Sequence, residues 1–150
     1  MTRFLTDTSC MVAVVCGWHE HHERAVREIE QRLSSGQELL VAAAGLVEAY
    51  AVLTRLPPPH RLSPPDTRAL LTANFTGDMA QIVALGVDTY MHLLQNAPER
   101  NIAGGAIYDA VILESGLAAG ADVLLTFNDR QFRALASSAI QIVVPPLARM

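Results

Sequence analysis

Short apolar runs alternate with segments of helical periodicity along almost the whole chain, and this alternation restricts the fold more than any other feature. The apolar runs typical of buried strands are residues 3–6, 39–42, 81–85, 123–126 and 141–144. The remaining segments predict helices over residues 9–16, 20–33, 45–56, 64–75, 88–96, 107–119 and 129–136. Strands that alternate with helices form a mainly parallel sheet with helices on both faces. We therefore expect an α/β fold built on a central parallel sheet.

Length and composition favour a single compact domain over residues 1–150. The chain has 150 residues, of which 51% are hydrophobic and 17% charged, so it can bury a substantial core and is not typical of a disordered protein. The one break in composition is the segment LPPPHRLSPP at residues 56–65. Consecutive prolines cannot continue a helix or a central strand, so we expect a loop here. This loop joins two helices and does not require a domain boundary.

The charge balance argues against a protein that coats nucleic acid nonspecifically. The net charge is −4, and all 11 basic residues are Arg. A chain of this kind can carry a local Arg patch for phosphate, but it lacks the broad positive field of a nonspecific binder. The apolar stretch at residues 10–18 is about half as long as a membrane span and lacks the basic leader of a signal peptide. We therefore expect a cytoplasmic protein.

Three carboxylates, Asp7, Glu48 and Asp109, lie almost alone in apolar surroundings, and no Lys or Arg is adjacent to any of them. Removing an ionised carboxylate from water costs several kcal/mol unless a partner compensates the charge. Asp7 follows a predicted strand, and the carboxyl ends of parallel strands are where α/β folds form their sites. We therefore expect the fold to gather the three carboxylates around a cation. Mg²⁺ and Mn²⁺ prefer oxygen ligands, whereas zinc favours Cys or His.

Each of these carboxylates also has an ordinary structural interpretation. Asp7 can cap the helix that follows it, although Thr8 and Ser9 are equally suitable cap residues. Glu48 can lie on a helix at the edge of the sheet, and Asp109 can pair with a distant Arg. A single cation site accounts for all three positions at once.

The order of several short motifs resembles that of PIN-domain proteins, and more closely that of VapC-type toxins from bacterial toxin–antitoxin pairs. The resemblance covers nearly the whole chain and rests on the segments Asp7-Thr8-Ser9, WHEHHERA at 18–25, Glu48 in its apolar helix, Ile107-Tyr108-Asp109-Ala110, and LLTFNDRQF at 124–132. Each motif is weak by itself, but their order and spacing together are specific. The resemblance implies a PIN-like domain with the sheet and helices described above.

It also implies a ribonuclease that depends on Mg²⁺ or Mn²⁺, with Asp7, Glu48 and Asp109 as catalytic residues and metal ligands. Asn128 occupies the place of a fourth acidic residue in that family, and a neutral amide there favours one firmly held metal over two. Asp129 is an alternative fourth ligand. Asn128 and Gln131 together also resemble a capping box, so Asn128 has two possible roles.

Several neighbouring residues are candidates for holding the substrate phosphate or a carboxylate. They are Thr8, Ser9, Thr126, Arg55 and Arg130.

Glu114 lies five residues after Asp109 and is expected to face away from it. The histidines at positions 19, 21 and 22 surround a predicted helix start, and we interpret them as a solvated helix cap and not as a zinc site.

The resemblance further implies a homodimer, an RNA substrate and a small VapB-like antitoxin that inserts a segment over the acidic cleft. Two other interpretations remain open at this point. The chain can be a non-toxin PIN nuclease of RNA processing. It can also be a catalytically weak PIN-like binding module, for which Asn128 is the main support.

Overall fold

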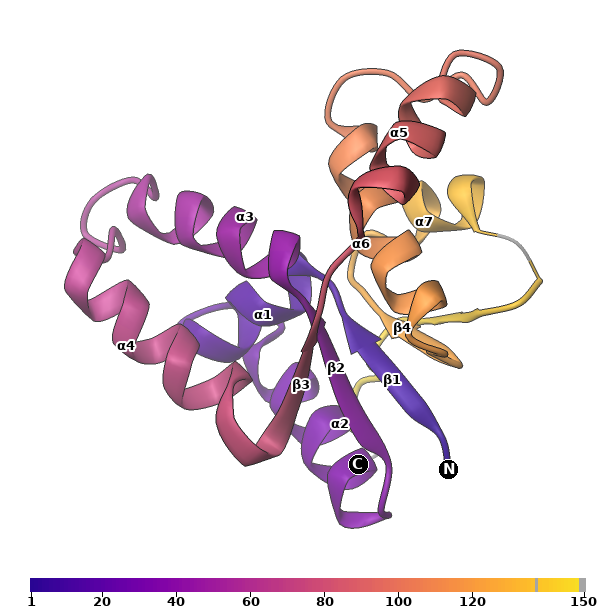
Figure 1. Ribbon diagram of the computed structural model, residues 1–150. Helices are drawn as coiled ribbons and strands as arrows, with labels where there is room; N and C mark the ends of the chain where they lie inside the picture. Colours follow the sequence, from indigo (N-terminus) through magenta and orange to yellow (C-terminus); the bar gives the residue numbers. More distant parts are fainter. Residues whose placement is uncertain (137, 149–150) are drawn as a thin grey trace.

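The computed structural model describes residues 1–136 and 138–148, and within these residues five parallel strands form one sheet (Figure 1). The strand order is β3-β2-β1-β4-β5, and every neighbouring pair is parallel. The strands are β1 (Arg3–Thr6), β2 (Glu38–Ala42), β3 (Ala80–Val83), β4 (Val123–Leu125) and β5 (Gln141–Val143). The predicted α/β fold with a parallel sheet is confirmed.

Helices connect the strands at all the predicted places, and their ends lie within two residues of the predicted ones. They are α1 (Thr8–Val15), α2 (His22–Ser34), α3 (Ala43–Thr54), α4 (Pro64–Phe75), α5 (Val87–Asn96), α6 (Ala106–Ala118) and α7 (Asp129–Leu135), with a short 3-10 helix η1 (Gly77–Met79). Within the described part of the chain, none of these helices is long and apolar enough to cross a membrane.

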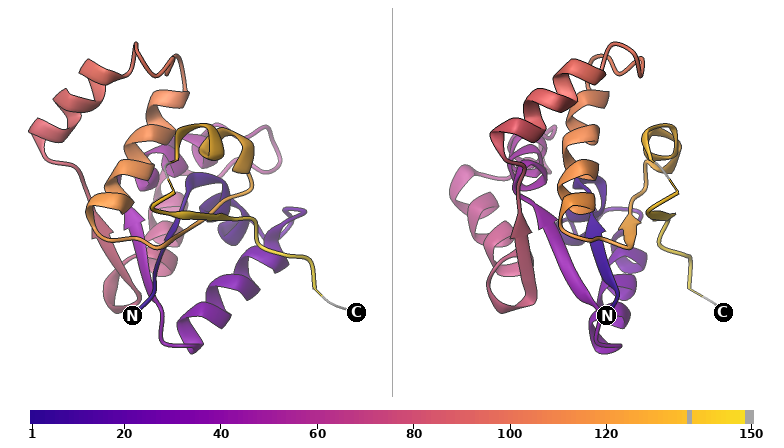
Figure 2. Two further views of the ribbon diagram at one scale, coloured as in Figure 1. Left: turned by 90° about the vertical axis from the view of Figure 1, so that its right-hand side faces the viewer. Right: turned by 45° about the vertical axis from the view of Figure 1, so that its right-hand side comes forward.

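The two faces of the sheet are covered by different groups of helices, because side chains on a strand alternate between its faces. Phe4 packs with residues of α1, α2, α3 and α4, whereas Leu5, its neighbour on β1, packs with residues of α6 and α7. Figures 1 and 2 show the two groups on opposite sides of the sheet. Phe4 and Leu5 are both fully buried. The central strand β1 therefore lies between two apolar cores.

The helix ends follow the capping preferences of their residues. Ser63 accepts a hydrogen bond from the amide of Asp66 and so caps α4, whose first residues are prolines, as the sequence indicates. The cap of α1 is Asp7, which accepts a hydrogen bond from the amide of Cys10, and not Thr8 or Ser9. Asp7 is therefore fixed at the end of β1 by the helix that it begins.

Gly116 allows α6 to lie directly against β1. A Cβ atom at this position would be 2.6 Å from Cδ2 of Leu5, which is fully buried. We expect Gly116→Ala to lower the free energy of unfolding by about 1–2 kcal/mol, even though Ala is the better helix former. Gly17→Ala is the control, because nothing lies within 4 Å of its Cβ position. Urea denaturation of both variants measures the difference, and an equal effect of the two substitutions would contradict this interpretation.

Candidate acidic site

The candidate site lies where the strand order reverses, between β1 and β4. From β1, the strands that come next in the chain, β2 and β3, lie on one side, and β4 and β5 lie on the other side. The amide of Asp7 donates a hydrogen bond to the carbonyl of Leu125, so the residues that follow the two strands begin side by side. Sheets of this type form their sites in the crevice at this point.

Asp7 is buried and its carboxylate accepts hydrogen bonds from three directions. Thr126 Oγ1 donates to Oδ2 at 2.6 Å, the Cys10 amide to Oδ1 at 3.0 Å, and Ser9 Oγ approaches the two oxygens at 2.7 and 2.9 Å. Burial raises the pKa of Asp7 above its usual value, and repulsion from Glu48 adds to this, whereas the hydrogen bonds lower it. The carboxylate is therefore held in a fixed orientation.

The other two carboxylates come from the first half of α3 and the first turn of α6. Helix α3 begins directly after β2, at the same edge of the sheet as Asp7, and it contacts α6. Glu48 and Asp109 are both partly buried. Burial, followed by repulsion from Glu48 and from Asp7, raises the pKa of Asp109 to about 6. The fold therefore brings the three carboxylates close enough to repel one another.

No basic side chain compensates these three charges among residues 1–136 and 138–148. The ion pairs nearby involve other acids: Arg100 pairs with Glu114 at 3.9 Å, and Arg133 pairs with Asp129 at 3.3 Å. Glu114 is thus directed to Arg100, as its predicted exclusion from the site requires, and Asp129 is already neutralised. In the same residues, no three His, Cys, Asp or Glu side chains lie close enough together to hold a metal ion, so the structure does not gather the three carboxylates into a preformed metal site.

Asn128 follows β4 as expected, but it does not form the capping box with Gln131. Asn128 is the N-cap residue of α7, but its side chain forms no cap bond; the backbone carbonyl of Asn128 accepts from the backbone amide of Gln131. The backbone amide of Asn128 donates to Thr126 Oγ1 at 2.8 Å, and the side chain is exposed. The capping-box interpretation is therefore wrong, and within residues 1–136 and 138–148 the side-chain amide of Asn128 forms no hydrogen bond.

The candidate phosphate-binding residues separate into three groups. Ser9 and Thr126 hold Asp7, whereas Thr8 Oγ1 is directed toward the carbonyl of Gly45 at 3.5 Å. Arg55 follows the last residue of α3, and Arg130 lies in the first turn of α7. Both arginines are exposed and form no ion pair or side-chain hydrogen bond in the described part of the chain.

One contact at the site was missed by sequence reasoning. The backbone amide of Phe127 donates to Ser9 Oγ at 3.0 Å, so the loop after β4 is tied to the residue that holds Asp7. A backbone amide leaves no signal in the sequence pattern. The ring of Phe127 stacks on His21 with centroids 4.4 Å apart, and His21 precedes α2 without a side-chain cap bond.

The raised pKa of Asp109 predicts a pH-dependent stability of the metal-free protein. The pKa of Asp109 is about 6 in the folded protein, against 3.8 in a model peptide, so folding favours its protonated form. This preference stabilises the fold fully below about pH 4, and the contribution is lost as the pH rises through 6. Allowing for its partial exposure, we expect Asp109→Asn to raise the free energy of unfolding at pH 7.5 by about 1–2 kcal/mol. The gain should vanish below pH 4. Chemical denaturation in EDTA at both pH values measures it, and a gain independent of pH would contradict the repulsion.

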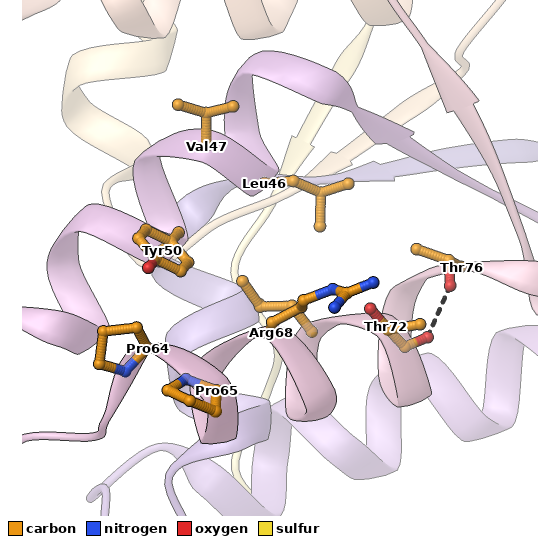
Figure 3. Close-up of a pocket in the computed structure, with 9 residues that line it drawn as sticks. Leu46, Val47, Tyr50, Pro64, Pro65, Arg68, Thr72 and Thr76 are labelled. Atoms are coloured by element: carbon orange, nitrogen blue, oxygen red, sulfur yellow. Dashed lines mark hydrogen bonds between the residues drawn. The ribbon is translucent and has the colours of Figure 1, made fainter.

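A groove with a volume of about 590 Å³ lies between α3 and α4, on the helix that carries Glu48 (Figure 3). Its lining is mainly apolar, with Arg68 as the charged member. Val47 and Tyr50, on its α3 side, are 71% and 40% exposed. The lining residues are Leu46, Val47, Tyr50, Pro64, Pro65, Arg68, Leu71, Thr72 and Thr76. This groove is an apolar surface on α3, the helix that also carries Glu48.

Comparison with known proteins agrees with the fold. Residues 4–137 match the PIN domain family. Ribonuclease VapC40 of Mycobacterium tuberculosis is 44% identical over 118 residues, which cover 79% of this chain and 81% of that protein. The structure of VapBC2 from Rickettsia felis bound to a promoter DNA fragment superimposes with a TM-score of 0.67 at 14% identity, covering 95% of this chain and 98% of the other. The Sarcin-Ricin loop cleaving toxin VapC20 of M. tuberculosis gives 0.66 at 14% identity, with 87% and 94% covered.

Proposed function

This chain belongs to the PIN-domain family, and from that membership and its acidic site we propose that it is a VapC-type ribonuclease, the toxin of a toxin–antitoxin pair. It would hydrolyse RNA phosphodiester bonds in the cytoplasm with the help of Mg²⁺ or Mn²⁺. The products would carry a 5′-phosphate and a 3′-hydroxyl.

The observation that carries this proposal is a group of three carboxylates that repel one another and have no basic partner in the described residues. Repulsion from Glu48 and Asp7 contributes to the raised pKa of Asp109, and repulsion from Glu48 to that of Asp7. Repulsion among partly buried carboxylates destabilises the folded state, and a bound cation would remove this repulsion. The oxygen donors suit a hard cation such as Mg²⁺, which keeps several waters and so does not need a closed set of protein ligands.

Asp7, Glu48 and Asp109 would hold the metal, and Asn128 would add an amide oxygen. When bound, the metal would neutralise charge at the phosphate and lower the pKa of a water molecule. Glu48, partly buried on α3, would orient that water and accept its proton. Ser9 and Thr126 are positioning residues, because they hold Asp7 by hydrogen bonds and would keep its oxygens directed into the site.

The antitoxin partner would occupy the groove between α3 and α4. The lining of the groove is apolar, and it includes Leu46 and Val47, which immediately precede Glu48 in the chain. An apolar helix of the partner would fit this surface, and its continuation would reach the acidic site. A basic residue in that continuation would neutralise the carboxylates and keep the toxin inactive.

The proposed homodimer has a candidate surface on α5. Val87, Met91 and Leu94 are spaced along one side of this helix and are 76%, 59% and 57% exposed. Apolar stripes of this kind on a helix are typical of surfaces that pack against another chain. A second copy of the chain would cover them.

Purified antitoxin-free protein, incubated with Mn²⁺ and a panel of structured RNAs, tests the proposed function. We expect specific cuts whose ends can be mapped, and no cuts in EDTA. If no RNA in the panel is cut, or if Asp7→Ala and Asp109→Ala cut equally well, the proposal fails. The neutral side chain of Asn128 favours one alternative, a binding module with weak catalysis, which would bind RNA or its partner in this assay without cutting.

A further inference from the structure

Five aromatic and imidazole rings form a row that begins at the acidic site and ends at the surface. Phe127 stacks on His21, His21 is followed by His19, and His19 is followed by Trp18, which stacks on His60. The centroid separations along this order are 4.4, 5.5, 5.8 and 4.0 Å, all in or near the range of direct ring contact. We call these residues the ring row.

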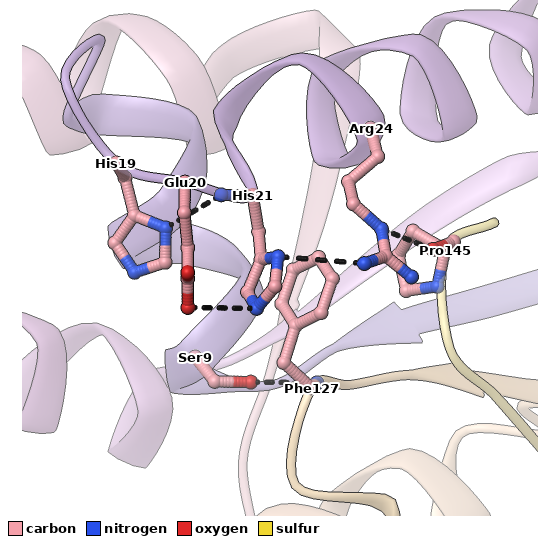
Figure 4. Close-up of polar contacts among 7 residues, drawn as sticks. All are labelled: Ser9, His19, Glu20, His21, Arg24, Phe127 and Pro145. Carbon is pink, nitrogen blue, oxygen red and sulfur yellow. Dashed lines mark hydrogen bonds and ion pairs between the residues drawn. The ribbon is translucent and has the colours of Figure 1, made fainter. Parts of the chain in front are cut away.

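The backbone of Phe127, at the inner end of the ring row, is linked to Asp7 through Ser9. The amide of Phe127 donates to Ser9 Oγ (Figure 4). Ser9 Oγ in turn contacts both carboxylate oxygens of Asp7. The outer end is exposed: Trp18 has 51% of its surface open to solvent although it stacks on His60, which is also exposed. The ring row thus leads from the reaction centre to solvent.

Backbone hydrogen bonds fix the residues that carry the outer rings. The amide of His21 donates to His19 Nδ1 at 3.0 Å, and the amide of His60 donates to the carbonyl of Pro57 at 3.0 Å. Burial, followed by repulsion from His21, lowers the pKa of His19, so its ring is neutral at pH 7. A surface that is already ordered loses little conformational entropy when it binds a ligand.

We propose that the ring row binds the bases of single-stranded RNA on one side of the cleaved phosphate, with Trp18 and His60 as the outer stacking platform. This inference rests on the proposed ribonuclease function and specifies the substrate as an unpaired segment. Bases stack on aromatic side chains without regard to sequence, because every base has a π-face. Only unpaired bases can reach such rings, so a loop or an open strand would be chosen over a duplex.

The charges beside the ring row are compatible with an RNA backbone. The guanidinium of Arg24 lies over the Phe127 ring at 5.3 Å, and its Nη1 is 3.4 Å from His21 Nδ1, whereas its Nε donates to the carbonyl of Pro145. Glu20 is the acidic side chain at the row, 3.3 Å from His21 Nε2, and it is 81% exposed and free to turn into solvent. Arg24 would therefore attract a phosphate near the inner rings.

Trp18 is the only tryptophan in the chain, so its fluorescence reports on the ring row directly. The experiment uses the full-length Asp109→Asn variant, which is not expected to cut RNA, in EDTA. A short oligouridine should quench the fluorescence in a saturable way, and an abasic ribose-phosphate chain of equal length should not. Quenching by the abasic chain to the same degree, or by neither chain, would overturn the proposal.

Substitution separates stacking from a structural role. In the same background, Trp18→Ala should weaken oligouridine binding by about 5- to 100-fold, whereas Trp18→Phe should keep most of the affinity. Met79→Ala is the matched control, since Met79 is 49% exposed and precedes β3, at the opposite end of the strands from the acidic site. Anisotropy of labelled RNA measures the affinity, and circular dichroism verifies the fold.

The RNA affinity of the Trp18→Ala variant also shows whether the ring row binds RNA or a protein partner. Unchanged RNA affinity in Trp18→Ala, together with a weaker complex with the antitoxin, would assign the ring row to the protein partner and overturn the proposal. Cleavage by the wild-type protein is measured in parallel on structured RNA. If cleavage occurs without quenching, only this inference fails, and if quenching occurs without cleavage, only the catalytic function fails.

Discussion

Asp7→Asn is expected to lower the rate of RNA cleavage at saturating Mn²⁺ by at least about a thousandfold. The substitution keeps the shape of the side chain but removes one charge from a buried site whose hydrogen-bond donors are arranged for a carboxylate. A metal held by the three acids would be bound much more weakly, and it would stabilise less of the charge that develops at the phosphate. Single-turnover cleavage of one mapped RNA site measures the loss.

Thr126→Val provides a graded comparison for this result. It removes the hydroxyl that donates to Asp7 Oδ2 at 2.6 Å and accepts from the amide of Asn128, but it leaves all three carboxylates in place. Loss of such a positioning contact is expected to reduce activity about 10- to 100-fold, and Thr126→Ser should recover most of it. If Asp7→Asn were no worse than Thr126→Val, the charge of Asp7 would not be essential and the metal-based proposal would be wrong.

The second large effect is expected from divalent cations on stability. Mg²⁺ or Mn²⁺ at about one hundred times its dissociation constant should stabilise the wild-type fold by about 2.7 kcal/mol. For a chain of this size that corresponds to a rise in Tm of roughly 5–10 °C. The physical reason is that the cation removes the repulsion that Glu48 and Asp7 exert on Asp109 and that contributes to its raised pKa. Differential scanning calorimetry of the metal-free protein, with and without the cation, measures the shift.

The necessary control separates specific binding from screening. Exposed charges are screened by any salt, so NaCl at equal ionic strength should give a much smaller shift if the cation is bound by the carboxylates. Asp109→Asn should have a higher Tm than the wild type in EDTA and a smaller response to Mn²⁺. Equal shifts in NaCl and Mn²⁺, or a full response of Asp109→Asn, would show that the carboxylates do not hold the metal.

Much of the fold could be predicted from the sequence, because its elements depend on local patterns. The helix Pro64–Phe75 agrees with the predicted one to the residue, since Ser63 and the two prolines determine where it begins. The strand Arg3–Thr6 also agrees, because it is a short apolar run that ends at a charged residue. The least accurate ends were those of α3 (Ala43–Thr54) and the start of α2 (His22–Ser34), each two residues from the predicted position, and neither helix has a side-chain cap bond at its start.

The three carboxylates were found from the sequence because an isolated charge in an apolar segment is conspicuous wherever the fold places it. Their surroundings were not predictable in the same way. Of the three residues considered for the α1 cap, Asp7 forms it and Thr8 and Ser9 do not, and the capping box of Asn128 and Gln131 is not formed. The contacts with the loop after β4 were not predictable either, because they join distant segments: Thr126 donates to Asp7, and the Phe127 amide donates to Ser9 Oγ.

The sequence alone thus determined the class of fold, the position of each element and the identity of the acids, because these follow from hydrophobic period, turn residues and the cost of burying charge. Tertiary structure decided the rest. Only the order of the strands places Thr126 beside Asp7, which is 119 residues away in the chain. Only the packing of α3 against α6 makes Asp109 and Glu48 repel each other, and only the meeting of two loops stacks Trp18 on His60. Contacts between distant segments depend on chain topology, and therefore they cannot be recognised from local sequence patterns.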